Sequence, residues 1–205
     1  MFELYTLGVI SLLAAMSPGP DFFVVSKNAI GYSRKAGCLT TLGISSGILL
    51  HSLYCILGLT VIVAHSLLLF SIIRYIGASY LIYLGIKGLF TKNVAMKKIK
   101  HQKNHLSNWK AFFDGFLVNL LNPKFIVFIL SIFTMVIKPN TAYWMQAVYA
   151  VELSIISTVW FFCLSFLLTH RKVKQRVNKI QTIALKIMGV VLIGFGLGML
   201  FDSHH

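Results

Sequence analysis

Charged residues are scarce in this chain, and acidic residues are the scarcest of all. Only 12% of the 205 residues are charged, and five of them are acidic, whereas soluble domains contain about 25% charged residues. Hydrophobic residues make up 57% of the chain, and its mean hydropathy is +0.80. Polar stretches long enough for a separate soluble domain are also missing. These absences exclude a soluble enzyme, an extracellular disulfide scaffold and a disordered chain, and they indicate a small polytopic membrane protein.

Cysteine is too rare and too scattered to support a disulfide framework or a zinc site. The three cysteines, Cys38, Cys55 and Cys163, lie in separate apolar stretches without CxxC spacing. We interpret them as small packing residues. Neither a metal site nor a cofactor is therefore expected.

Six apolar stretches are present, each long enough to cross a bilayer as a helix of about 20 residues. The alternation of apolar and polar residues that a membrane β-strand would show is absent from them. They occupy residues 4–25, 38–64, 67–90, 112–137, 142–170 and 180–201. The sequence thus predicts an all-α polytopic membrane protein with six transmembrane helices.

Basic residues are concentrated in alternate loops between these stretches. The first, third and fifth loops contain fourteen Lys and Arg residues, whereas the opposite side of the membrane has two, Arg74 and Lys138. Because Lys and Arg accumulate in cytoplasmic loops, this bias predicts that both termini are periplasmic. The formal charge of +14 is then a topology signal, and no nucleic-acid partner is expected.

The first and fourth stretches share a proline followed by a charged residue. Residues 17–21 read Ser-Pro-Gly-Pro-Asp, and residues 122–124 read Asn-Pro-Lys. Three spans separate the two segments, so they cross the membrane in opposite directions, as the broken helices of inverted-repeat transporters do. We predict two inverted three-helix repeats, 1–90 and 112–205, joined by a basic cytoplasmic loop at 91–111 within a single membrane domain.

Each proline is expected to break its helix inside the membrane. Proline removes a backbone donor and clashes with the carbonyl four residues earlier, and freed groups in hydrocarbon need another partner. Ser17 and Asn122 precede prolines and are good N-cap residues, so each break is expected to begin a half-helix whose N-terminus suits a carboxylate. The alternative interpretation is that the prolines only bend the helices. Two breaks at mirrored positions, each next to a charged residue, favour a functional role instead.

At these residues the chain resembles the LysE/RhtB family of bacterial amino-acid exporters. The matching motifs are Ser-Pro-Gly-Pro at 17–20, spaced glycines over 31–47, Gly-Ala-Ser-Tyr-Leu-Ile-Tyr-Leu-Gly at 77–85, and the segment 115–124. The resemblance implies a multi-pass transporter of the bacterial inner membrane, not an enzyme, that exports amino acids by proton antiport. Its partners would be the amino-acid substrate, protons and the lipid bilayer.

The two breaks supply the expected substrate site. Asp21 is expected to hold the substrate ammonium or the coupling proton, because a carboxylate within a span faces a cavity or a partner. Lys124 would pair with Asp21 or hold the substrate carboxylate, and both asparagines can donate and accept. One acid near the break favours homoserine, threonine or leucine over lysine or arginine. The expected binding residues are Ser17, Pro18, Gly19, Pro20, Asp21, Asn119, Asn122, Pro123 and Lys124.

Two further titratable residues, Glu152 and His51, lie within spans. Each could carry the coupling proton beside Asp21 or could be a packing residue. A metal-ion or other small-solute exporter of the same superfamily is the alternative function, although these three residues are too few and too scattered to favour a metal. A thiol-based redox carrier would need a cysteine at each break, and neither break contains one. Gly43 and Gly47 form a GxxxG motif that serves packing within one subunit as readily as in a homo-oligomer.

Overall fold

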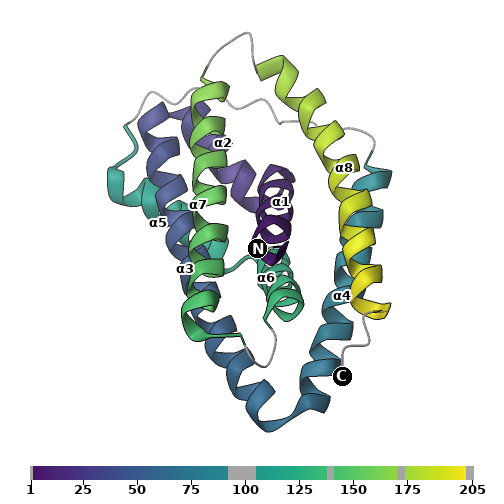
Figure 1. The fold of residues 1–205 in the computed structure, drawn as a ribbon. Helices are drawn as coiled ribbons and strands as arrows, with labels where there is room; N and C mark the ends of the chain where they lie inside the picture. The colour runs from purple at the N-terminus through teal and green to yellow at the C-terminus, as the bar shows by residue number, and fades with distance from the viewer. Residues whose placement is uncertain (1, 92–104, 138–140, 170–173, 202–205) are drawn as a thin grey trace.

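The computed structural model of the protein describes residues 2–91, 105–137, 141–169 and 174–201. Within these ranges every regular element is a helix, so the predicted all-α fold is confirmed there. The basic residues in 92–104 and 171–173 lie outside the described residues. The helices, drawn in Figure 1, are α1 (Phe2–Met16), α2 (Pro20–Gly31), α3 (Arg34–His65), α4 (Leu67–Phe90), α5 (Asn108–Leu120), α6 (Pro123–Val136), α7 (Tyr143–Leu168) and α8 (Lys174–Phe201).

Two of the predicted spans are each divided into two helices, as their prolines suggested. The chain bends by 57° between α1 and α2 and by 61° between α5 and α6. Pro20 begins α2 and Pro123 begins α6, because the fixed φ and missing donor of proline suit the first helical turn. The two predicted breaks are therefore confirmed.

The caps of the two half-helices differ from one another. Asn122 caps α6, where its side chain accepts a hydrogen bond of 3.4 Å from Phe125 N–H, as predicted. Ser17 does not cap α2, so that prediction was wrong: the cap is Gly19, whose extended backbone makes no side-chain bond. The reason is that Pro20 occupies the first helical position, which requires the residue directly before it to be the cap.

Three unbroken helices, α3, α4 and α7, each contain a segment long and apolar enough to cross a membrane. If α1 with α2 and α5 with α6 are each counted as one bent span, the number of such spans is five. In α8, which has 28 residues, the apolar helical part Leu185–Phe201 is shorter than a full span. The order of a broken pair followed by two long helices occurs in both halves of the chain. The sixth span, the inverted relation of the halves and the periplasmic termini remain predictions.

The helices form two groups with α1 and α6 between them. α4 packs along α8, and α3 packs with α2, α5 and α7. Glycines allow the closest approaches within each group, because a Cβ at Gly115 would collide with the carbonyl oxygen of Thr40, and one at Gly85 would lie 2.6 Å from the carbonyl oxygen of Gly189. These glycine faces therefore serve packing within one subunit.

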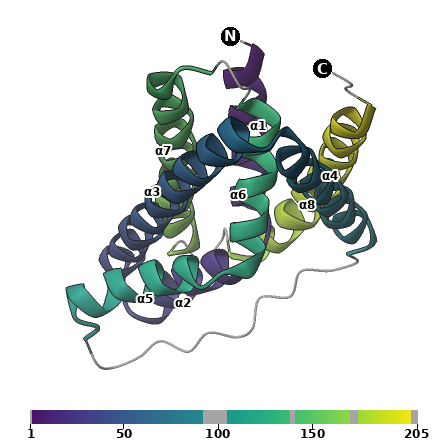
Figure 2. The same cartoon turned by 90° about the horizontal axis from the view of Figure 1, so that it is seen from below.

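The two ends of the bundle are packed differently. At the end where α1 begins and α8 ends, α1 packs against α8 and α6 packs against α4 (Figure 2). At the other end, among the described residues, neither α2 nor α5 is packed against α4 or α8 to a similar extent. We call these the closed end and the open end of the bundle.

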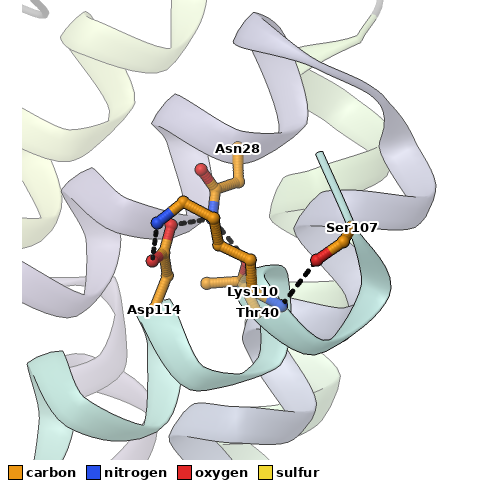
Figure 3. A network of polar contacts seen from close by, with 5 residues as sticks. All are labelled: Asn28, Thr40, Ser107, Lys110 and Asp114. Carbon is orange, nitrogen blue, oxygen red and sulfur yellow. Dashed lines mark hydrogen bonds and ion pairs between the residues drawn. The ribbon is translucent and has the colours of Figure 1, made fainter. Parts of the chain in front are cut away.

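A network of polar contacts holds α2 and α5 to α3 at the open end (Figure 3). Asn28 Nδ2 donates to Thr40 Oγ1 at 2.8 Å and to Asp114 Oδ2 at 3.3 Å. Asp114 in turn forms an ion pair of 3.6 Å with Lys110, whose backbone N–H donates to the cap residue Ser107. One half of each broken span is thus fixed to the same long helix.

Candidate functional site

The two breaks lie against each other, and hydrogen bonds cross between them in both directions. Asn119 Nδ2, near the end of α5, donates to Asp21 Oδ2 at 2.9 Å. Lys124 Nζ, in the first turn of α6, donates to Ser17 Oγ at 2.9 Å. Each break therefore contributes one charged group that is held by a neutral side chain of the other break.

The two charges do not form a direct pair. Asp21 and Lys124 both belong to the described residues, and no ion pair of 4.0 Å or less joins them. Gly19 lies beside the lysine, since a Cβ built on Gly19 would be 3.6 Å from Lys124 Nζ. Because carboxylate and ammonium are bound by neutral partners, both are left with capacity for further polar contacts.

Two oxygen atoms at the breaks are buried without a hydrogen-bond partner in the described structure, Asp21 Oδ1 and Asn119 Oδ1. Most buried polar atoms in native proteins have a partner, and leaving one without costs about 1–3 kcal/mol. Both atoms are acceptors, but Asn119 Oδ1 faces Gly47 on α3, whereas Asp21 lines a cavity, where a cationic donor could satisfy its free oxygen.

His51 and Tyr80 hold the second break in place. His51 is 2% exposed, and its Nε2 lies 3.2 Å from the carbonyl oxygen of Asn119, the residue four positions before Pro123. The hydroxyl of Tyr80 donates to the Lys124 carbonyl at 3.2 Å. His51 thus has a structural partner, as a packing histidine would, and it also touches a residue of the breaks.

A small cavity lies next to the breaks. It gives water-sized molecules about 50 Å³ of room, which is enough for about four waters at roughly 10–15 Å³ each. Ser17, Asp21 and Lys124 line it at the breaks, and Phe128 and Phe161 form part of its apolar wall. We call this space the inner cavity.

A second cavity of about 700 Å³ reaches from the breaks towards the open end. Pro18 and Pro123 line it at the breaks, whereas Lys87 and Thr91 line it at the end of α4. Lys124 borders both spaces. The substrate-site residues are therefore reached from the open end, and we call this space the vestibule.

Glu152 lies apart from the breaks. It stands on α7 beside α1, where its Oε1 would be 3.0 Å from a Cβ on Gly8, and its Oε2 is buried without a partner in the described structure. It lines a separate apolar groove next to Trp144 instead of either cavity at the breaks. The described residues also contain no group of three or more His, Cys, Asp and Glu that could hold a metal ion.

Two polar residues of the inner cavity, Ser11 on α1 and Ser157 on α7, were not singled out from the sequence. A lone serine in an apolar helix carries little signal. The spacing of Ser11 with Ala14 and Ala15, which places three small residues on one helix face, is the signal that could have found the first of them.

Comparisons with known proteins identify the family. The LysE type translocator family model matches residues 12–203. The membrane protein YrhP of Bacillus subtilis, described as uncharacterized, is 34% identical over 196 residues, which cover 92% of this chain and 93% of the relative. The threonine efflux protein of Escherichia coli is 30% identical over 203 residues, which cover 96% of this chain and 97% of the relative. That of Salmonella typhimurium is 29% identical over 208 residues, which cover 98% of this chain and 99% of the relative. No solved structure matches. The chain therefore belongs to the LysE type translocator family and is a multi-pass transport protein of the cytoplasmic membrane.

Proposed function

We propose that the protein exports a small neutral amino acid of the homoserine, threonine or leucine type by alternating access and proton antiport. One observation carries this proposal: two broken spans meet at a small cavity and present a carboxylate and an ammonium that do not pair with each other. Relatives of nearly the same length are named threonine efflux proteins, which supports the same class of substrate.

The charges at the breaks suit the two ends of an amino-acid zwitterion. Asp21 Oδ1 is a buried acceptor without a partner among the described residues, and Asp21 lines the inner cavity, so a substrate ammonium would supply the missing donor. Lys124 uses one donor on Ser17, and its other donors suit the substrate carboxylate. One acid and one base leave no second acid for the side chain of a dicationic substrate.

The size of the inner cavity favours a small side chain. Because the cavity has room for about four waters, a substrate with a short side chain, such as threonine, homoserine or leucine, suits it better than lysine or arginine does. The aromatic wall formed by Phe128 and Phe161 suits the carbon part of such a side chain.

The packing of the two ends supports alternating access. α1 and α6 pack against α4 and α8 at the closed end, whereas the vestibule leads from the breaks to the open end. The helices α2, α4 and α7 end at the open end, and each is followed in the sequence by a segment predicted to be cytoplasmic from its basic residues. A substrate would enter from the cytoplasm in this state and leave after the closed end has opened.

Proton coupling is assigned to Asp21. While ionised, the carboxylate would hold the substrate ammonium, and protonation from the outer side would weaken that hold. One charge moved across 100 mV is worth about 2.3 kcal/mol, which supports a concentration ratio of roughly fiftyfold. Glu152 and His51 stay secondary candidates, since Glu152 lies away from the breaks and His51 already contacts Asn119.

Transport by the purified protein in proteoliposomes tests the function. We expect an imposed pH gradient to drive labelled threonine, homoserine or leucine, and Asp21→Asn to abolish this proton-driven flux. Asp114→Asn is the matched control, because Asp114 lines neither cavity at the breaks. Proton-driven flux that survives Asp21→Asn would refute the role of Asp21. If the wild-type protein transports none of the twenty common amino acids or homoserine, amino-acid export is refuted. The flux of divalent metal ions would then be measured.

A further inference from the structure

One buried hydroxyl on the wall of the inner cavity has no partner. Ser11 is 1% exposed, and its Oγ is buried without a hydrogen bond in the described structure. Serine hydroxyls in helices commonly donate to the carbonyl four residues earlier, and Ser52 and Ser165 do so here at 2.9 Å. Ser11 makes no such bond, so it is a buried polar group whose partner is missing.

The helix face that carries Ser11 leaves space in front of it. Ser11, Ala14 and Ala15 share one face of α1, and all three line the inner cavity. Ser157 on α7 also lines the cavity and is 4% exposed. The part of the cavity away from the breaks thus combines apolar walls with two hydroxyl groups.

Ser11 and the charged groups at the breaks border one space. Ser11 precedes Ser17, which binds Lys124, by six residues, or about 9 Å along a helix axis, and Ser11, Asp21 and Lys124 all line the inner cavity. A substrate held at the breaks by its charged groups would therefore direct its side chain into the part of the cavity that Ser11 borders.

We propose that Ser11 determines which side chain is transported, by hydrogen bonding to a hydroxyl of the substrate. This inference rests on the proposed amino-acid export and narrows its substrate to a hydroxylated amino acid. An aliphatic side chain of equal size would fill the same space and leave the Ser11 hydroxyl unpaired. A site built to bond a hydroxyl discriminates strongly against an analogue that lacks it.

Threonine and valine form the probe pair, because they have nearly the same shape and differ in the hydroxyl. The measurement is counterflow of labelled threonine in proteoliposomes, inhibited by unlabelled threonine or valine. For the wild type we expect threonine to inhibit at lower concentration than valine. In Ser11→Ala we expect the ratio of the two inhibitory concentrations to fall about three- to tenfold, the equivalent of one neutral hydrogen bond.

Ser165→Ala is the matched control for this substitution. Ser165 is also a fully buried helix serine, but its hydroxyl already donates to the Phe161 carbonyl, and it lines neither cavity at the breaks. We expect the ratio of the inhibitory concentrations of valine and threonine in Ser165→Ala to equal that of the wild type. Ser157→Ala is measured in parallel, because Ser157 also lines the cavity. A ratio that falls in Ser157→Ala but not in Ser11→Ala would assign the hydroxyl contact to Ser157 and overturn the role of Ser11.

The outcomes separate this inference from the proposed function. Intact threonine flux with an unchanged ratio in Ser11→Ala would overturn the role of Ser11 and mean that its hydroxyl binds water only. Equal inhibition of the wild type by threonine and valine would overturn it without any variant. Absence of amino-acid flux in the wild type would refute the proposed function itself.

Discussion

Gly47→Ala should damage the site while leaving the fold largely intact. Gly47 lies on α3 next to the end of α5, and a Cβ there would be 2.6 Å from Asn119 Oδ1 and 3.2 Å from Asn119 Cβ. The side chain of Asn119 must therefore move. Since Asn119 Nδ2 donates to Asp21 at 2.9 Å, this movement would release the carboxylate from the position that it holds between the breaks.

The size of the effect follows from the bond that is lost. A hydrogen bond to a charged group is worth about 1.5–3 kcal/mol, which corresponds to roughly a tenfold to hundredfold change in affinity. We therefore expect the half-saturating concentration of labelled threonine in proteoliposomes to rise by that factor. Overpacking at the contact should also lower the free energy of unfolding by about 1–3 kcal/mol.

Gly58→Ala on the same helix is the matched control. Nothing lies within 4 Å of a Cβ at Gly58, so alanine there should gain up to about 1 kcal/mol of helix stability and leave transport unchanged. Unaltered threonine affinity in Gly47→Ala would refute the reasoning that Asn119 positions Asp21. An equal loss in Gly58→Ala would refute the claim that the effect is local.

Three further predictions concern packing and the isolated acid. The first variant carries Gly77→Cys and Ser131→Cys after replacement of the three native cysteines, and it joins α4 to α6, because a Cβ on Gly77 would lie 3.1 Å from Ser131 Cβ. Oxidation of this variant should stop transport, and a reductant should restore it. Transport by the fully cross-linked protein would contradict the prediction. Gly115→Ala should yield little folded protein in size-exclusion chromatography, since its Cβ collides with the Thr40 carbonyl oxygen; a normal yield would count against this packing. Glu152→Gln should leave the melting temperature unchanged or raise it, because one carboxylate oxygen is buried without a partner in the described structure, and a clear fall would indicate a contact that stabilises the charge.

The broken spans could be predicted from the sequence because the effect of proline is local. Pro20 and Pro123 act on their own helical turns whatever packs around them. The cap of α2 could not be assigned so simply, because residues 17–20 contain two prolines and the second one decides where the helix begins. Asn122 was assigned correctly, since one proline follows it and fixes the register.

The contacts between the breaks could not be predicted, because they depend on how separate helices pack. Asp21 and Lys124 were natural partners by charge, yet each is bound by a neutral side chain of the opposite break. The position of Glu152 could be predicted only in part. Its depth in the membrane follows from its place along α7, but the side of the helix from which its side chain projects does not. That face points towards Gly8 and an apolar groove, away from the breaks.

The packing also indicates which interfaces would separate during transport. The α3–α5 and α4–α8 contacts bring glycines against backbone atoms of the facing helix, so neither pair can slide without a clash. Asn28 and Asp114 add a polar link between α2, α3 and α5. The interfaces of α1 with α8 and of α6 with α4 have another place in the bundle, because they join the two groups of helices at the closed end. We therefore expect the closed end to open by separation of these two interfaces, with the proline breaks as pivots, because the backbone there already lacks the hydrogen bonds that a continuous helix would have to lose.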